Sequence, residues 1–378
     1  MLFGTFWEEY ESTVVDLIKP AKEPSFRPGF AGRRPDPDRI GAAVSSRTQE
    51  DCLPMNKLCV LITSIFLTPG DDVDRFLAAH GAETVYRPWH GGRTEEELID
   101  LLRGIDGAIV STDPFSARVI QAADRLKVIS RTGVGYDAVD VKAATEHGIV
   151  VTTTPGVNRH AVADWALALM LCCARRVPEN LAEVRRGAWT RHEGMDLNGK
   201  TLGVVGLGTI GKEVAKRAKA FGMRLLAFDL VQDLPFAEGQ GIVYVPLEEF
   251  LRQSDVVSIH CFLNEATRHL INAERLALMK PTAFLINTAR GGIVDTDALY
   301  RVLRDKRIAG AGLDVFEGEP LRTDSPLRAL ENVYLSPHCA GSTTDARRRS
   351  GAMAAENLIR ALRGERPEGI VNPEVLAR

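Results

Sequence analysis

The 378-residue sequence lacks two features that would each point to a particular class of protein. It has no excess of basic residues: 47 Lys and Arg against 50 Asp and Glu leave a net charge of −3. This balance excludes the cationic surface that nucleic acids and anionic membranes attract. The sequence also has no uninterrupted apolar run of about 18 residues, the length that a transmembrane helix needs. We therefore predict a soluble globular protein with neither a nucleic-acid partner nor a membrane span.

Cysteines are few, and their spacing forms no motif. The six cysteines, at positions 52, 59, 172, 173, 261 and 339, include no C-x-x-C pair. This pattern excludes an obvious zinc site and suits reduced thiols, so we expect a cytoplasmic protein.

Residues 1–56 contain six prolines and little apolar periodicity, and no continuous apolar segment there resembles a signal peptide. We expect a flexible leader, and Met55, just before the first strand, leaves an upstream start open.

From residue 58 onward the sequence alternates between strand and helix patterns. Apolar runs at 58–63, 84–86, 107–110, 127–130 and 149–152 are separated by helical patterns at 71–80, 94–103, 116–123 and 139–147. After an apolar helix at 158–175 and an amphipathic helix at 180–189, strands follow at 201–205, 224–228, 256–260, 283–287, 308–313 and 333–335, with helices at 210–221, 247–252, 272–279, 295–305 and 343–363. Such alternation predicts α/β structure in which parallel sheets carry helices on both faces. The length suits two such domains.

The strand at 201–205 runs into a glycine motif, GLGTIG, at residues 206–211. Gly206 allows a tight turn, Gly208 lets the backbone approach a pyrophosphate, and Gly211 lets helix and strand pack closely. The following helix N-terminus supplies N–H groups and partial positive charge. Asp229 ends the next strand, where a carboxylate accepts hydrogen bonds from the adenosine ribose. The pattern predicts a dinucleotide, and NAD over NADP, because Asp229 would repel a 2′-phosphate and residues 230–234 contain no Lys or Arg.

Polar or glycine-rich segments follow several of the predicted strands. Ligands of open parallel sheets lie beyond the carboxyl ends of the strands, so these segments are the candidates for the chemistry. They are RTGVGYD at 131–137, TTPGVN at 153–158, HCFL at 260–263, NTARGG at 287–292, DVFEGEP at 314–320 and SPHCAG at 336–341. The last three supply a cation, carboxylates and an imidazole that can converge on one cleft.

With these segments the sequence resembles the D-isomer-specific 2-hydroxyacid dehydrogenases. NTARGGIVD, LDVFEGEP, SPHCAGST and GLGTIG stand in the family's order and spacing, and the resemblance covers about 58–372. It leaves the phosphoglycerate dehydrogenase-like and hydroxypyruvate reductase-like branches both open. The resemblance implies a substrate domain made of 57–155 and 340–378, with a Rossmann-type NAD-binding domain, 156–339, inserted into it. Both domains would be Rossmann-like or flavodoxin-like. The resemblance also implies a homodimer formed through the cofactor domains and the helices at 158–189.

The resemblance implies catalytic roles for three residues. Arg290 is the substrate clamp, because a guanidinium fork suits the carboxylate and ketone oxygens of a 2-oxo acid. His338 is the general acid/base, for which imidazole is suited near neutral pH. Glu319 is its carboxylate partner, which holds the ring and favours its protonated form. The implied reaction interconverts a D-2-hydroxy acid and its 2-oxo acid with NAD, and no metal is implied because polarisation falls to Arg290 and His338.

Other positions match the family's binding residues. Val134 and Gly135 match the loop whose N–H groups bind the substrate carboxylate. The positions expected near the cofactor are Gly206, Gly208, Thr209, Ile210, Gly211, Asp229, Thr288, Ala289, Asp314, Ala340 and Gly341. Two residues depart from the family pattern: Phe262 replaces a proline in the adenine-side loop, and Asp164 replaces the more usual Glu.

Two other functions stay open at the level of sequence. A non-enzymatic NAD-sensing scaffold would use the same fold, as the C-terminal-binding transcriptional corepressors do, and those relatives keep similar catalytic residues. The neutral charge balance and the lack of an added interaction module oppose it. A methyltransferase would have a similar fold and a similar acid, and the cleft residues oppose it. A phosphorylated substrate would need extra cations, for which Arg131 or Arg159 are candidates. No serine-sensing domain follows residue 378, so we expect no feedback regulation of the long phosphoglycerate dehydrogenase type.

Overall fold

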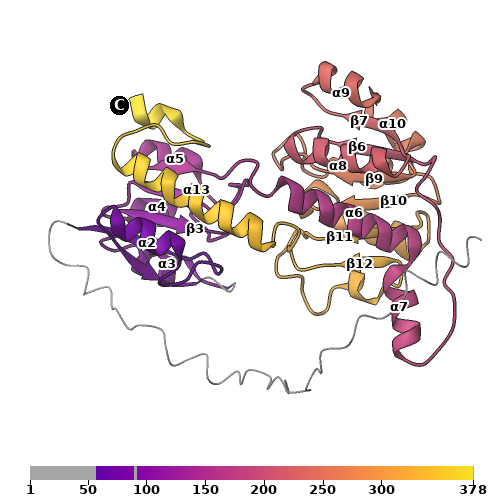
Figure 1. Ribbon diagram of the computed structural model, residues 1–378, viewed down its shortest axis with the longest axis horizontal. Coiled ribbons are helices and arrows are strands. Elements are labelled where there is room, and N and C mark those ends of the chain that lie inside the picture. Colours follow the sequence, from indigo (N-terminus) through magenta and orange to yellow (C-terminus); the bar gives the residue numbers. More distant parts are fainter. Residues whose placement is uncertain (1–56, 89–91, 378) are drawn as a thin grey trace, which may run out of the picture. The chain divides into compact units, whose positions relative to one another are not determined.

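The described chain is built on two separate parallel sheets (Figure 1). The computed structural model describes residues 57–88 and 92–377, and the leader predicted at 1–56 lies outside the described residues. None of the helices in these ranges combines the length and apolar character needed to cross a membrane. The two parallel sheets and the helices that connect their strands confirm the predicted α/β class.

The first sheet has five strands in the order β2-β1-β3-β4-β5, and all neighbouring strands are parallel. They are β1 (Leu58–Ile62), β2 (Ala82–Tyr86), β3 (Gly107–Val110), β4 (Val128–Arg131) and β5 (Val150–Thr152). This is the flavodoxin-like order, which reverses direction between β1 and β3. In folds of this kind, ligands bind beyond the carboxyl ends of the strands at such a reversal.

Alternate strand residues of the first sheet face two different hydrophobic cores. Cys59 and Leu61 pack with α3 (Glu95–Leu101), α4 (Ala117–Ala122) and α5 (Val141–Glu146). Val60 and Ile62 pack with α2 (Asp72–Ala79) and with α13 (Thr344–Leu362). Helix α13 comes from the end of the chain and lies against β3 and β4 (Figure 1). The end of the chain thus completes the first sheet's core.

The second sheet has seven strands in the order β12-β11-β10-β9-β6-β7-β8, again all parallel. They are β6 (Thr201–Val205), β7 (Arg224–Phe228), β8 (Ile242–Tyr244), β9 (Val256–Ile259), β10 (Phe284–Asn287), β11 (Gly310–Leu313) and β12 (Val333–Leu335). From β6 the chain first builds outward through β7 and β8, and then returns to the other side at β9. This is the Rossmann pattern, and its reversal lies between β6 and β9.

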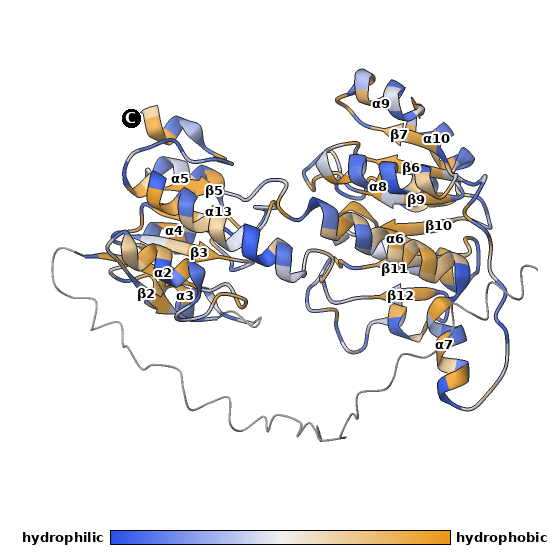
Figure 2. Ribbon diagram, viewed as in Figure 1, coloured by the Kyte–Doolittle hydropathy of each residue, from blue (hydrophilic) through white to orange (hydrophobic). Residues whose placement is uncertain are grey.

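Both faces of the second sheet are covered. Leu202 and Val204 pack with α6 (Arg159–Arg175), α8 (Thr209–Ala220) and α9 (Leu234–Gln240). Val205 and Val257 face α10 (Leu247–Gln253), α11 (Ala273–Leu276) and α12 (Thr296–Arg304). Figure 2 shows the strands and most of α6 as hydrophobic. Burial on both faces explains why these strands are continuous apolar runs in the sequence.

Two expectations about local structure were wrong. The helix predicted at 180–189 is α7 (Val177–Arg185): Pro178 occupies its first turn, and Gly187, at φ 81°, follows its end. Helix α9 and strand β8 were not predicted at all. Pro235 and Gly239 weaken the helical pattern of α9, and β8 has only three residues, of which Val243 is exposed.

Candidate active site and dinucleotide site

The glycine motif joins β6 to α8 at the point where the strand order reverses. Gly206 has φ 89°, and a Cβ there would lie 2.6 Å from Cys261 N. A Cβ at Gly211 would lie 2.1 Å from Gly206 O, so only glycine allows this approach of helix and strand. At Gly208, by contrast, a Cβ would meet no atom within 4 Å. The loop is therefore packed against its neighbours and has free space at Gly208 for an anion at the helix N-terminus.

Asp229 fastens this loop to the end of β7. Its Oδ2 accepts from Leu207 N at 2.7 Å, and its Oδ1 accepts from Val231 N at 3.1 Å. A carboxylate has about four lone-pair sites, so each oxygen retains the capacity to accept a ribose hydroxyl. The nearby Lys212 is paired with Asp233. The charge left at the carboxyl end of β7 is therefore negative.

Two buried polar atoms at this edge of the sheet have no partner among the described residues. They are Nδ1 of His260, which follows β9, and Oγ1 of Thr288, which follows β10. The other ring nitrogen of His260 is 2.8 Å from Ser258 Oγ, and burial lowers the pKa of His260 to about 3, so the ring is neutral. Buried polar atoms normally have partners, and a bound dinucleotide would supply them. The edge between β6, β9 and β10 thus fits the predicted cofactor.

His338 and Glu319 form a close pair, with Nδ1 of the ring 2.7 Å from Oε2 of the carboxylate. Glu319 Oε1 accepts from Phe316 N at 3.0 Å, which fixes the carboxylate in turn. Burial raises the pKa of Glu319, but the hydrogen bond and charge of His338 outweigh it, and the pKa is lowered. An ionised carboxylate only accepts hydrogen bonds, so Nδ1 carries a proton and Nε2 is the ring atom left for proton transfer.

Asp314 holds the loop that carries His338. The side chain is fully buried, and its carboxylate accepts from Cys339 N at 3.0 Å, Ala340 N at 2.8 Å and Ser336 Oγ at 2.5 Å. The backbone N–H of His338 donates to Asp314 O at 2.8 Å, and His338 has a left-handed φ of 50°. These bonds hold His338 in a conformation that is uncommon for a residue other than glycine.

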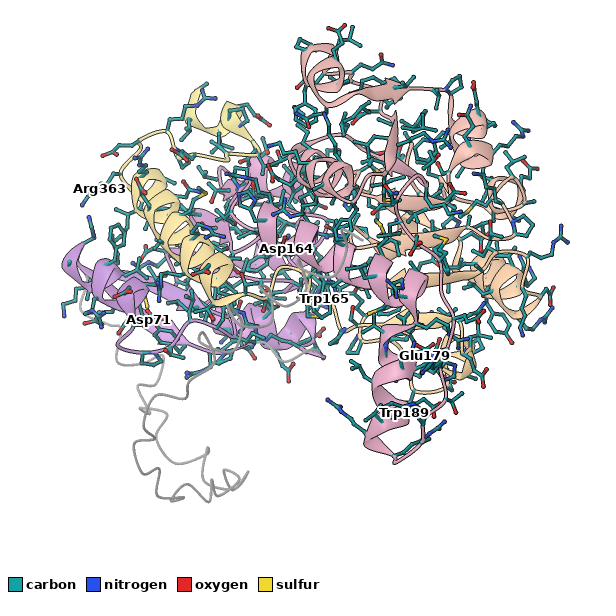
Figure 3. All side chains as sticks on the ribbon, turned by 45° about the vertical axis from the view of Figure 1, so that its right-hand side comes forward. Asp71, Asp164, Trp165, Glu179, Trp189 and Arg363 are labelled. Atoms are coloured by element: carbon teal, nitrogen blue, oxygen red, sulfur yellow. The ribbon has the colours of Figure 1, made fainter. Side chains whose placement is uncertain are left out.

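The indole of Trp165, on α6, extends this network. Its Nε1–H donates to Ser336 Oγ at 3.1 Å, so the hydroxyl that serves Asp314 is itself fixed (Figure 3 labels Trp165). Asp314, expected near the cofactor, therefore uses both carboxylate oxygens to organise the segment at 336–340.

Arg290 reaches across to the loop that follows β4. Its Nε is 3.0 Å from Asp137 Oδ1, and its Nη1 donates to Ala289 O at 2.8 Å. Its Nη2 lies against Gly135, where a Cβ would be 1.6 Å away. Burial raises the pKa of Asp137, and the charge and hydrogen bond of Arg290 overcome this and lower it. The same guanidinium also lowers the pKa of Glu319. Arg290 therefore contacts the glycine loop, and its charge acts on the carboxylate of the imidazole–carboxylate pair.

The backbone of that loop is available to bind an anion. The N–H groups of Val134 and Gly135 donate to no other group in the described part of the chain. Arg131, just before them, is buried, and its Nε donates to Ser111 O at 2.8 Å. Desolvation, followed by the charge of Arg290, lowers the pKa of Arg131 to about 10. Arg131 therefore serves as a buried support of the loop.

The structure thus groups most of the predicted residues at two neighbouring edges. Gly135 meets Arg290, His338 meets Glu319 and Asp314, and the cofactor positions follow β6, β7, β10 and β11. Asn158 also lies here, since a Cβ at Gly341 would be 3.3 Å from its Nδ2. Sequence reasoning assigned no role to Asp137, Trp165, Ser336 or the side chain of His260. Asp137 and Arg290 are 153 residues apart, so their pairing leaves no local signal.

Comparison with known proteins gives consistent matches. The family model described as "D-isomer specific 2-hydroxyacid dehydrogenase, NAD binding domain" matches residues 167–340. Glyoxylate reductase of Korarchaeum cryptofilum is 48% identical over 291 residues, covering 75% of this chain and 87% of that protein. D-3-phosphoglycerate dehydrogenase of Methanocaldococcus jannaschii is 44% identical over 285 residues, covering 74% of this chain and 54% of that protein.

Solved structures show the same fold. The TT0316 protein of Thermus thermophilus is 43% identical with a TM-score of 0.76, covering 83% of this chain and all of that one. D-lactate dehydrogenase of Aquifex aeolicus, solved with NAD and lactic acid, is 30% identical with a TM-score of 0.72, covering 84% and 97%. An acyclic imino acid reductase solved with NADPH and D-Arg is 29% identical with a TM-score of 0.74, covering 83% and 100%.

Proposed function

Because the chain belongs to the D-isomer-specific 2-hydroxyacid dehydrogenases, we propose that it reduces a small, unphosphorylated 2-oxo acid, such as glyoxylate or hydroxypyruvate, with NADH. The observation that carries the proposal is the His338–Glu319 pair, 2.7 Å apart, within the electrostatic reach of Arg290. An oriented imidazole beside a guanidinium supplies both the proton and the positive charge that reduction of a carbonyl requires.

The proposed mechanism gives each group a defined task, and Arg290 has two. The free N–H groups of Val134 and Gly135 bind the substrate carboxylate, and Nη2 of Arg290, which lies against Gly135, completes that anion site. Arg290 also polarises the keto oxygen, on which negative charge develops. His338 donates the Nε2 proton to that oxygen while Glu319 stabilises the ring. A dinucleotide held at the glycine motif would supply the hydride for the keto carbon. The product is the 2-hydroxy acid.

The state of the nearby arginines supports an unphosphorylated substrate. Arg131 is buried and donates to Ser111 O, while Arg93 is paired with Asp113, 2.5 Å away, and donates to Arg87 O. A phosphate group binds best to arginines with free N–H groups, and these two are already engaged. Arg159, the other candidate, is exposed and lies beside the N-terminus of α8, at the dinucleotide site. The glyoxylate reductase relative is similar over most of its length, whereas the phosphoglycerate dehydrogenase relative is similar over about half.

The charge around Asp229 supports NAD as the preferred cofactor. A 2′-phosphate would lie close to this carboxylate, residues 230–234 contain no cation, and Lys212 is neutralised by Asp233. The solved relatives include one with NAD and one with NADPH. The preference is therefore proposed from this chain's own residues.

The proposed division into a substrate domain (57–155 and 340–378) and a cofactor domain (156–339) has two supports. Helix α13 packs on the first sheet, and Asn372 Oδ1 accepts from Val151 N at 2.8 Å.

We also propose a homodimer in which the exposed apolar side chains on and after α7 are covered. Leu181, Val184 and Trp189 are 58%, 60% and 78% exposed (Figure 3 labels Trp189). Light scattering of the Leu181→Asp and Val184→Asp variants tests this proposal, because both variants should be monomeric. The cytoplasmic location stays a prediction.

A substrate panel tests the proposed reaction. Purified protein is assayed for NADH oxidation with glyoxylate, hydroxypyruvate, 3-phosphohydroxypyruvate and pyruvate, and each assay is repeated with NADPH. We expect the highest kcat/KM with an unphosphorylated acid and NADH. Preference for the phosphorylated acid would contradict the substrate argument. Tight NADH binding without turnover on any acid would instead favour the NAD-sensing scaffold.

A further inference from the structure

Helices α6 and α8 pack side by side with a constant register that starts at their N-termini. Arg217 Nε donates to Asp164 Oδ1 at 2.7 Å, and one turn earlier His160 Nδ1 lies 3.3 Å from Glu213 Oε2. One turn earlier again, a Cβ at Gly156 would lie 3.8 Å from Cγ2 of Thr209. Each contact steps back by four residues on both segments, about one helical turn. The two helices are therefore parallel, and both begin beside the glycine loop.

Both of these N-termini are free of the usual capping groups. Neither helix has a side-chain hydrogen bond from its N-cap residue, and neither has an acidic residue in its first turn. Every other α-helix in the described ranges has at least one of these features. Two aligned helix N-termini without a negative side chain create a local positive potential.

Arg159, the first residue of α6, adds a full positive charge at this place. Its Nη1 donates to Gly156 O at 3.2 Å, and the same Nη1 lies 3.3 Å from a Cβ built on Gly156, next to Thr209. Arg159 is exposed and makes no ion pair with a described residue. Three cations on α8 are already paired: Lys212 with Asp233, Lys216 with Glu213, and Arg217 with Asp164 and Glu213. The fourth, Lys219, lies in the last turn of the helix, away from its N-terminus.

We propose that Arg159 binds the pyrophosphate of the dinucleotide from outside the glycine motif. The motif itself, GLGTIG, contains no cationic side chain, whereas a pyrophosphate carries two negative charges. A guanidinium can donate two parallel hydrogen bonds to phosphate oxygens, and the N-terminus of α8 supplies backbone N–H groups opposite it. Arg159 therefore serves the cofactor and not a substrate phosphate. The inference uses only the dinucleotide site and does not depend on the identity of the 2-oxo acid.

The test compares binding of dinucleotide fragments to the wild-type protein and to Arg159→Gln by calorimetry. Loss of a charged hydrogen bond weakens binding by about ten- to a hundredfold. We expect this loss for NADH and for ADP-ribose, which contain the pyrophosphate, and no change for adenosine, measured by competition against NADH. The matched control is Arg175→Gln, at the other end of the same helix, about 24 Å away along its axis, which should bind all three ligands normally.

Two outcomes would overturn the proposal. Unchanged affinity of Arg159→Gln for ADP-ribose would remove the arginine from the phosphate site. An equal loss for adenosine and ADP-ribose would show a general change in the domain instead. Steady-state kinetics give an independent readout: KM for NADH should rise about tenfold or more while kcat stays within about twofold, and Arg159→Lys should recover part of the loss.

Discussion

A single methyl group added at Gly135 should displace the guanidinium of Arg290 while leaving the stability of the fold nearly unchanged. In Gly135→Ala the new Cβ would lie 1.6 Å from Nη2 of Arg290, 2.7 Å from its Cζ and 3.0 Å from Asp137 Oδ1. The guanidinium must therefore move by about 2 Å to regain a normal van der Waals distance. Arginine is long and flexible, so the move costs the fold little, but Arg290 loses the place where it would meet the substrate.

The magnitudes follow from the exposure of the Arg290–Asp137 pair and from the charge that Arg290 would stabilise. The two side chains are 27% and 48% exposed, so loss of their ion pair should lower the free energy of unfolding by about 1 kcal/mol or less. Loss of a positioned donor in the transition state, by contrast, typically lowers the rate about 10²- to 10³-fold. We expect kcat/KM for the preferred 2-oxo acid to fall by that factor. NADH affinity should remain unchanged because the glycine motif is untouched.

Three measurements on Gly135→Ala decide the matter: kcat/KM, the dissociation constant of NADH and the midpoint of urea unfolding. Gly239→Ala is the matched control, since a Cβ there meets no atom within 4 Å and alanine favours helix α9. It should keep its activity and gain about 0.5 to 1 kcal/mol in stability. A kcat/KM of Gly135→Ala within about threefold of the wild type would refute the assigned position of Arg290. A large loss of NADH binding would show that the change spreads beyond the loop.

The other predictions concern the acid-base pair, its support and the cofactor. His338→Ala should lower kcat by about 10²- to 10⁴-fold while NADH still binds, and unchanged turnover would remove His338 from the mechanism. Folding lowers the pKa of Glu319 below its ordinary value of 4.5. The pair with His338 therefore stabilises the fold fully when the pH is above 4.5, and this stabilisation is lost as the pH falls through the lowered pKa. Urea unfolding of Glu319→Gln between pH 3 and 6 should therefore depend less on pH than that of the wild type, and an identical dependence would contradict the pairing. Ser336→Ala removes a donor to Asp314 and should lower kcat about tenfold, measured against Ser336→Thr, which keeps the hydroxyl; equal rates would show that this bond does not support His338. Asp229→Ala should weaken NADH binding and reduce the preference for NADH over NADPH. It removes the carboxylate that repels a 2′-phosphate and that accepts a hydrogen bond from Leu207 N. An unchanged ratio of the two affinities would make Asp229 a purely structural residue.

Much of the fold was predictable because its signals are local. Leu202, Val204 and Val205 belong to one short apolar run, since both faces of a parallel strand are buried, and this run can be identified in the sequence before any contact is known. The glycine motif and Asp229 likewise lie within one continuous segment of strand, turn, helix and strand, so their relation can be predicted from the sequence. Where local preference was weak, the boundaries of α7 were inaccurate, and α9 and β8 were not predicted.

Local sequence by itself therefore determined the alternation of strands and helices and the segments that follow the strands. Only the tertiary structure decided which of those segments meet. Asp137 and Arg290 come from different sheets, Trp165 reaches Ser336 from a helix far away in sequence, and Arg131 donates to Ser111 O, not outward to a ligand. The spacing of Gly156, His160 and Asp164 against Thr209, Glu213 and Arg217 becomes visible only when α6 and α8 lie parallel. Such pairings depend on packing between distant segments, and the sequence of one segment does not identify its partner.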